Sequence, residues 1–158
     1  MKHSPIVKTL LWPDEAATEV FAQQLAKALT RVSPLQACVT LHGDLGAGKT
    51  TLVRHLLRAL GVRGRIKSPT YAVVEPYQVD AGSVWHFDFY RFNDPREWED
   101  AGFRDIFASP GLTLCEWPDK AAGMLPTPDV SVHIQVNDQE QRVVTCQAHT
   151  PHGEALLA

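Results

Sequence analysis

A run of eight residues fills every fixed position of the phosphate-binding pattern G-x-x-x-x-G-K-[ST], namely Gly43, Asp44, Leu45, Gly46, Ala47, Gly48, Lys49 and Thr50. Glycines let backbone N–H groups curl around phosphate oxygens with no side chain in the way. A lysine at position 49 can reach the β- and γ-phosphates of a nucleotide, and the hydroxyl of Thr50 can ligate Mg²⁺. The run therefore predicts a site for ATP or a related triphosphate with Mg²⁺, against the alternative of a merely glycine-rich turn.

Hydrolysis of a bound triphosphate also needs a carboxylate at the metal and an ordered water. Glu116 directly follows the apolar run 112–115, so it is placed at the end of a buried strand. Asp88 lies in the aromatic run 86–91, where an unpaired acid would be costly to bury. We favour Glu116 as the metal-linked group and Asp88 as the acid that holds or orients water. The alternatives are a surface carboxylate for Glu116 and a structural pair with Arg91 or another base for Asp88.

The segment after the phosphate-binding run holds further candidates. Thr70, in a loop before a strand, can sense the γ-phosphate as switch threonines do, or can simply belong to a turn. A small basic cluster in the same loop either is solvated or contacts RNA phosphates, and it comprises Arg63, Arg65 and Lys67. Trp117 fits core packing or a partner contact, and Trp12 fits the core better than a stack on a nucleobase. The histidines show no ligand spacing, so none is assigned to a metal.

The elements around these residues predict an α/β fold. The apolar run 37–41 indicates a buried strand before the loop, and 51–60 indicates a helix that ends at Gly61. Asp14 is the expected N-cap of a helix that ends near Thr30. Further helices are expected from Pro95 and over 103–108, and further strands over 71–75, 84–92, 112–115, 130–136 and 141–148. The first residues form a short mixed segment, and the tail from Thr150 is expected to fray. We therefore predict a P-loop NTPase-like, three-layer domain with a mixed parallel and antiparallel sheet flanked by helices.

Composition narrows the class of protein. The chain has 158 residues, which suits a single P-loop ATPase domain over 1–158. It is 44% apolar with a formal net charge of −3, so bulk electrostatics do not make it a stand-alone nucleic-acid binder. No apolar stretch is long enough to cross a bilayer, no signal peptide is evident, and the three cysteines lie in apolar strands. We expect a cytoplasmic location, no membrane contact and buried free thiols.

Missing motifs narrow the choice among phosphate-loop proteins. The chain lacks the N-K-x-D motif of GTPases and the L-S-G-G-Q signature of transporter ATPases. No arginine-dense lid segment is evident, which weighs against a small-molecule kinase. Two alternatives to an ATPase stay open at this point. One is a kinase that uses Asp88 as its base, and the other is a nucleotide-gated binding module without catalysis.

Four strings in one order give a resemblance to a known family. They are Gly-Asp-Leu-Gly-Ala-Gly-Lys-Thr-Thr at 43–51, Lys-Ser-Pro-Thr-Tyr at 67–71, His-Phe-Asp-Phe-Tyr-Arg at 86–91 and Glu-Trp-Pro at 116–118. Together they resemble the TsaE (YjeE) family, bacterial ATPases of tRNA threonylcarbamoyladenosine biosynthesis, from about Trp12 to the mid-130s.

The resemblance implies a mixed-sheet phosphate-loop domain that binds ATP and Mg²⁺, with residues 43–51 around the nucleotide. It places Thr50 and Glu116 on the metal side, with Asp88 and Thr70 in the same site. It also implies action with TsaB and TsaD, where ATP hydrolysis permits repeated turnover, and contact with tRNA through that complex.

Overall fold

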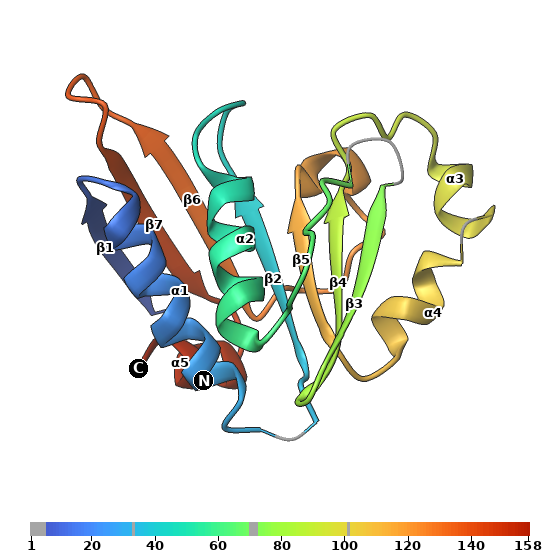
Figure 1. Cartoon of the computed structure of the whole chain (residues 1–158). Coiled ribbons are helices and arrows are strands. Elements are labelled where there is room, and N and C mark those ends of the chain that lie inside the picture. The colour runs from blue at the N-terminus through green and yellow to red at the C-terminus, as the bar shows by residue number, and fades with distance from the viewer. Residues whose placement is uncertain (1–5, 33, 70–72, 101) are drawn as a thin grey trace, which may run out of the picture.

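The computed structural model describes residues 6–32, 34–69, 73–100 and 102–158. Within them one seven-stranded sheet has the order β1-β7-β6-β2-β5-β4-β3 (Figure 1). Its strands are β1 (Val7–Trp12), β2 (Ala37–His42), β3 (Val74–Val79), β4 (Gly82–Asp88), β5 (Leu112–Glu116), β6 (Val130–Val136) and β7 (Arg142–Ala148). The sheet is mixed, as predicted from the sequence.

The central strands are parallel and the outer ones antiparallel. β6, β2, β5 and β4 run in one direction, whereas β3 pairs antiparallel with β4 and β7 pairs antiparallel with both β6 and β1. The carboxyl ends of β2, β4 and β5 therefore meet at one edge of the sheet. Ligands of open α/β sheets bind at such an edge, where the connections diverge to opposite sides.

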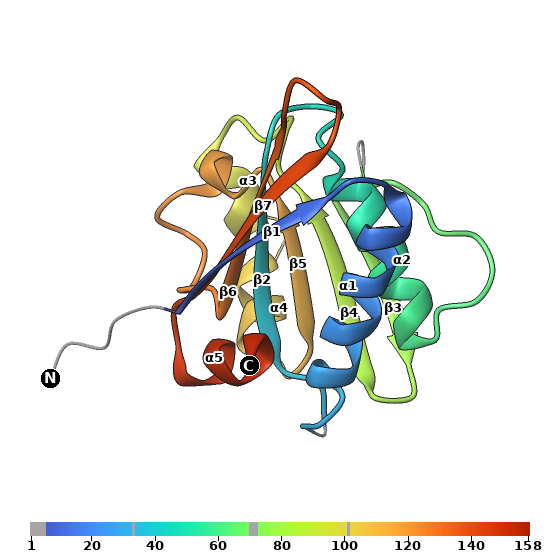
Figure 2. The ribbon, with the colours of Figure 1, turned by 90° about the vertical axis from the view of Figure 1, so that its left-hand side faces the viewer.

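Helices cover both faces of the sheet (Figures 1 and 2). α1 (Glu15–Leu29) and α2 (Lys49–Leu60) lie on one face, and α3 (Pro95–Asp100) and α4 (Phe103–Ala108) lie on the other. The 3₁₀-helix η1 (Pro118–Ala121) follows β5, and α5 (Pro151–Leu157) contacts α1, β6 and β7. Within the described ranges, no helix is both long and apolar enough to cross a membrane.

The two faces of the sheet have separate hydrophobic cores. Alternate side chains of β5 point to opposite faces, so Leu114 packs in the core under α1 and α2 while Cys115 packs with aromatic residues under α3 and α4. The second core stacks Phe87 and Trp98 on Phe107, with ring centroids 4.9 and 5.3 Å apart. Alternate residues of β4 and β5 therefore face α2 and the phosphate-binding loop (residues 43–48), and the residues between them face α3 and α4.

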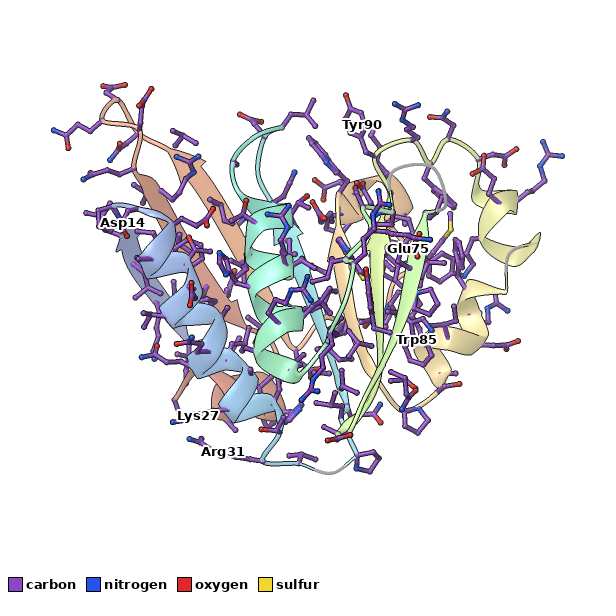
Figure 3. All side chains as sticks on the ribbon, in the orientation of Figure 1. Asp14, Lys27, Arg31, Glu75, Trp85 and Tyr90 are labelled. Carbon is purple, nitrogen blue, oxygen red and sulfur yellow. The ribbon has the colours of Figure 1, made fainter. Side chains whose placement is uncertain are left out.

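Several elements form as their local signals predict. Asp14 caps α1 by accepting a hydrogen bond from the N–H of Ala17 at 3.0 Å, while Lys27 lies near the opposite end of the helix (Figure 3). Gly61 ends α2 in the left-handed conformation. The helix at 103–108 and the hairpin of β6 and β7 are also confirmed. The three cysteines are buried free thiols, as expected.

No strand was predicted at the start of the chain, and the prediction for its tail was wrong. The mixed segment at the start contains β1, which pairs with β7 along its whole length. The tail does not fray but forms α5, capped by Thr150, whose Oγ1 accepts from the N–H of Gly153 at 3.0 Å. Gly153 lets this helix pack closely against the backbone of Asp129, because a Cβ at position 153 would be 1.9 Å from the carbonyl oxygen of Asp129.

The strand predicted over 84–92 is shorter than expected. β4 ends at Asp88, and the chain then turns, with the N–H of Phe92 donating to the carbonyl of Phe89 at 2.9 Å. Asp88 therefore ends a strand and does not lie inside one. The strand expected over 71–75 begins at Val74, and residues 70–72 lie outside the described residues.

Candidate functional site

The phosphate-binding loop joins the end of β2 to the start of α2. Gly43 passes close to β6, where a Cβ would be 2.6 Å from the carbonyl oxygen of Ile134. Gly48 is the N-cap of α2 with a φ of 113°, a left-handed conformation that favours glycine. The N–H groups in the first turn of a helix have no partner within it and carry the positive end of the helix dipole. The loop thus has the backbone geometry that suits a phosphate.

Lys49 is held inside this loop. Its side chain is 4% exposed, its Nζ donates to the carbonyl oxygen of Gly43, and the same Nζ lies 3.7 Å from the ring centroid of Trp117. Burial lowers the pKa of Lys49, and neighbouring carboxylates, first that of Glu116, oppose this shift. A carbonyl dipole and an aromatic face are weak partners for an ammonium group. A phosphate would be a stronger partner.

Thr50, in the first turn of α2, meets Glu116 at the carboxyl end of β5. Oγ1 of Thr50 donates to the Glu116 carboxylate, at 3.0 Å from Oε1 and 3.3 Å from Oε2. Glu116 is 2% exposed, and its Cα is in register with those of Leu41 and Asp88. A hydroxyl and a carboxylate are hard oxygen donors of the kind Mg²⁺ takes alongside phosphates and waters.

A magnesium site in a nucleotide-binding protein needs few protein ligands. No group of three or more His, Cys, Asp or Glu residues that could hold a metal occurs in the part of the chain that the structure describes. Mg²⁺ in nucleotide sites needs only one or two protein carboxylates, because phosphate and water fill the other positions. The Thr50 and Glu116 pair fits that requirement.

Asp88 lies on the other side of Glu116, at the end of β4. Its Oδ1 accepts from the N–H of Tyr90 at 2.9 Å, and the side chain is half-buried. Burial raises the pKa of Asp88, and the charge of Glu116 adds to this rise. With Lys49, Thr50 and Glu116 it lines a cleft of about 390 Å³. The structure therefore brings together four of the predicted site residues.

The raised pKa of Asp88 predicts that replacing this residue stabilises the protein when no ligand is bound. When the pKa of a carboxyl group is higher in the folded state, the ionised form is disfavoured on folding. The protein therefore becomes less stable as the pH rises above 3.8, the ordinary pKa of the group. Asparagine stays neutral and keeps an acceptor for the N–H of Tyr90. Asp88→Asn should raise the melting temperature near pH 7 by about 2 °C, and the gain should shrink toward pH 3.8. Thermal melts in EDTA would contradict this if the variant melted at or below the wild type near pH 7.

The remaining predicted residues fall around this cleft with one exception. Leu45, Gly46, Gly48 and Thr51 line it, while Asp44 and Ala47 close a turn of the loop through a 3.0 Å backbone hydrogen bond. Thr70 lies outside the described residues, so its role stays a prediction. Val73, the first described residue after the gap at 70–72, lies beside the site, because its carbonyl accepts from the N–H of Asp88 at 2.8 Å. All three residues of the basic cluster, Arg63, Arg65 and Lys67, are exposed.

Two site residues were missed from the sequence. His86 is 1% exposed and its Nε2 lies 2.5 Å from Oε2 of Glu116. The signal was its spacing, because residues two apart in a strand share a face and so His86 points the same way as Asp88. Arg142, at the start of β7, donates from Nε to the carbonyl of Ala47 at 2.8 Å. Nothing local marked that residue, since the contact depends on how distant strands pair.

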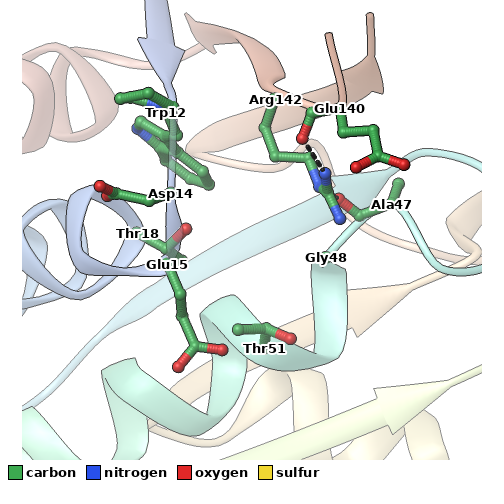
Figure 4. Close-up of a pocket in the computed structure, with 10 residues that line it drawn as sticks. Trp12, Asp14, Glu15, Thr18, Ala47, Gly48, Thr51, Glu140 and Arg142 are labelled. Carbon is green, nitrogen blue, oxygen red and sulfur yellow. Dashed lines mark hydrogen bonds between the residues drawn. The ribbon is translucent and has the colours of Figure 1, made fainter. Parts of the chain in front are cut away.

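A second pocket adjoins the phosphate-binding loop and is bordered by Ala47 and Gly48 (Figure 4). It has a volume of about 240 Å³ and lies between the start of α1 and the start of β7. Trp12 is a core residue, as preferred from the sequence, with 4% exposure and its ring 5.1 Å from that of Phe21. It nevertheless lines this pocket, opposite Arg142 (Figure 4). Gly48, Thr51 and Arg142 border both this pocket and the cleft.

Known proteins resemble this chain in both sequence and fold. A family model described as "Threonylcarbamoyl adenosine biosynthesis protein TsaE" matches residues 12–144. A Haemophilus influenzae protein named tRNA threonylcarbamoyladenosine biosynthesis protein TsaE is 42% identical over 147 residues, covering 92% of each chain. Proteins of the same name from Synechocystis and Bacillus subtilis are 40% and 31% identical, covering 68% and 90% of this chain and 68% and 87% of their own.

A solved structure has the same architecture over nearly the whole chain. The crystal structure of Bacillus subtilis YdiB superposes with a TM-score of 0.76 at 26% identity, covering 99% of this chain and 95% of that one. The family match spans every predicted site residue from Gly43 to Glu116. The chain therefore belongs to the TsaE family.

Proposed function

We propose that this protein binds ATP with Mg²⁺ at the phosphate-binding loop and hydrolyses it to ADP and phosphate. The observation that carries the proposal is the meeting of Lys49, Thr50 and Glu116 at one sheet edge, beside the first turn of α2. A buried ammonium group, a hydroxyl and a buried carboxylate beside the start of a helix match the needs of a triphosphate and its metal.

The cleft and the adjoining pocket suggest how ATP is oriented in the site. The triphosphate occupies the 390 Å³ cleft, and the nucleoside extends past Gly48 and Thr51 into the 240 Å³ pocket. Trp12 gives this pocket an aromatic wall, and Asp14 and Glu15 offer hydrogen-bond acceptors to the base or ribose. Arg142 stands at the junction, where its guanidinium group can fix the loop against the nucleotide.

The chain's own groups act mainly by position and charge. Lys49 leaves the Gly43 carbonyl and Trp117 to pair with the phosphates, which neutralises charge as the γ-phosphate departs. Asp88 orients the attacking water at the edge of the cleft, in line with the bond to ADP. Thr50 and Glu116 would hold Mg²⁺, which would supply further charge neutralisation at the phosphate oxygens.

We further propose that the activity serves tRNA threonylcarbamoyladenosine biosynthesis together with TsaB and TsaD. The names of the TsaE relatives support the pathway. The mouth of the cleft supports a protein partner, because Leu45 and Tyr90 border it and are 67% and 39% exposed. Exposed apolar side chains at a site mouth suit a partner that covers the site and excludes water.

Turnover by the isolated protein should therefore be slow, and adding purified TsaB and TsaD should raise the rate of phosphate release at least about tenfold. The measurement is steady-state phosphate release with each protein alone and with all three. Lys49→Ala in the same mixture is the control, because it reports any ATPase contributed by the partners. An unchanged rate in a mixture that forms a complex would count against the partner role but not against ATP binding.

A further inference from the structure

His86 and Glu116 form a buried pair directly behind the metal-linked end of the site. Their side chains are 1% and 3% exposed, and His86 Nε2 lies 2.5 Å from Glu116 Oε2. The pair spans the two parallel strands β4 and β5, whose register fixes Asp88 beside Glu116. Since His86 lies two residues before Asp88, its ring projects to the same face, toward α2.

The other ring nitrogen of His86, Nδ1, is buried in an unusual environment. Among the residues that the structure describes, Nδ1 of His86 is the buried side-chain nitrogen or oxygen atom with no hydrogen-bond partner. A neutral imidazole carries its proton on one nitrogen and a lone pair on the other. A proton on Nδ1 would leave a buried N–H unpaired and would set the Nε2 lone pair against a carboxylate oxygen. The proton therefore belongs on Nε2, and His86 donates to Glu116.

The carboxylate is thus held from two sides. His86 donates to Oε2, while Thr50 donates to Oε1 at 3.0 Å and more weakly to Oε2 at 3.3 Å. A glutamate side chain has several rotatable bonds, so a single hydrogen bond would leave its plane free to turn. Two donors, His86 on β4 and Thr50 on α2, remove that freedom and direct Oε1 toward the Thr50 hydroxyl.

We propose that His86 is a positioning residue that sets the Glu116 carboxylate for the Mg²⁺–nucleotide complex. The inference rests on the proposed function, because it concerns the same metal-linked acid. Hydrogen-bond partners behind a metal ligand fix its orientation, and their loss commonly weakens metal affinity or activity 10- to 100-fold, on the order of what we expect here. A histidine that served only to fill the core would leave the response to Mg²⁺ unchanged.

Matched substitutions separate these two roles. The side-chain amide nitrogen of glutamine reaches about as far as Nε2, so His86→Gln keeps a donor to Glu116. The amide of asparagine stands nearer the position of Nδ1, so His86→Asn keeps a polar group but not that hydrogen bond. His86→Leu removes both nitrogens and leaves an apolar side chain among buried neighbours. If the asparagine variant does not fold, the leucine variant replaces it in the comparison with glutamine.

The test is a fluorescent ATP-analogue titration in EDTA and again at increasing Mg²⁺. We expect His86→Asn or His86→Leu to need about tenfold more Mg²⁺ for the half-maximal effect, with affinity in EDTA within about twofold of wild type. His86→Gln should return the Mg²⁺ midpoint to within about threefold of wild type. Thermal melts confirm that each variant is folded at the assay temperature.

Two results would overturn the inference. One is an unchanged Mg²⁺ midpoint in the folded asparagine or leucine variant. The other is an equal loss of affinity with and without Mg²⁺, which would show a general packing defect. If the wild-type protein itself bound the analogue with no response to Mg²⁺, the proposed function would fail before the role of His86 was reached.

Discussion

Lys49→Ala should raise the dissociation constant for ATP about 100-fold or more and reduce phosphate release to background. A charge-assisted hydrogen bond from a buried donor contributes up to about 3 kcal/mol, which corresponds to roughly two decades in affinity. Lys49 is the buried cation that faces the loop, held by the Gly43 carbonyl and the Trp117 ring. Titration with a fluorescent ATP analogue and a phosphate-release assay measure the two losses separately.

The effect must be distinguished from a general loss of positive charge. Lys27→Ala is the matched control, because Lys27 is exposed in the last turn of α1 and borders neither the cleft nor the pocket beside the phosphate-binding loop. It should bind and hydrolyse ATP as the wild type does. Lys49→Met adds a second control, since it keeps an apolar stem of similar length and removes only the ammonium group. Wild-type affinity and turnover in Lys49→Ala would show that the nucleotide site lies elsewhere.

Glu116→Gln should lower the rate of ATP hydrolysis about 100-fold or more while it weakens ATP binding less than about tenfold. Glutamine has nearly the same shape and can accept the hydrogen bond from Thr50, so the loop should keep its form. It lacks the negative charge that the carboxylate offers at the metal side of the cleft. Single-turnover hydrolysis and equilibrium titration, both at saturating Mg²⁺, separate the chemical step from binding.

Glu97→Gln is the control for Glu116→Gln, because Glu97 is an exposed carboxylate in α3 on the opposite face of the sheet. It should leave both binding and hydrolysis unchanged. Equal hydrolysis in Glu116→Gln and the wild type would reject the metal-linked role of this carboxylate. A parallel loss of binding and hydrolysis would instead make Glu116 a residue of nucleotide affinity alone.

Local signals predicted the centre of this fold well. The apolar run before the phosphate-binding loop, the cap at Asp14 and the glycine at the end of α2 each act through neighbours in sequence, and all formed as predicted. Glu116 was placed at a strand end because an apolar run stopped there, and β5 ends at that residue. Since short-range hydrogen bonds and burial decide these features, the sequence alone was enough.

Long-range pairing decides what the sequence did not reveal. β1 is an edge strand whose partner β7 lies at the far end of the chain, and most of its residues are exposed, so its local pattern was ambiguous. α5 had a readable start in Thr150 and Pro151, but its short length made docking, not propensity, decisive. His86 and Arg142 reach the site only through sheet register and strand order, which no local pattern contains. The role of Thr70 remains a prediction.

A crystal structure with Mg²⁺ and a non-hydrolysable ATP analogue would show whether the nucleotide binds at the phosphate-binding loop. We predict phosphate oxygens within hydrogen-bond distance of the backbone N–H groups at the start of α2 and of Lys49 Nζ, with Lys49 released from the Gly43 carbonyl. It also predicts the metal beside Thr50 and Glu116, and the nucleoside in the pocket lined by Trp12. An analogue bound at another surface, with Lys49 still on the Gly43 carbonyl at saturating ligand, would contradict it.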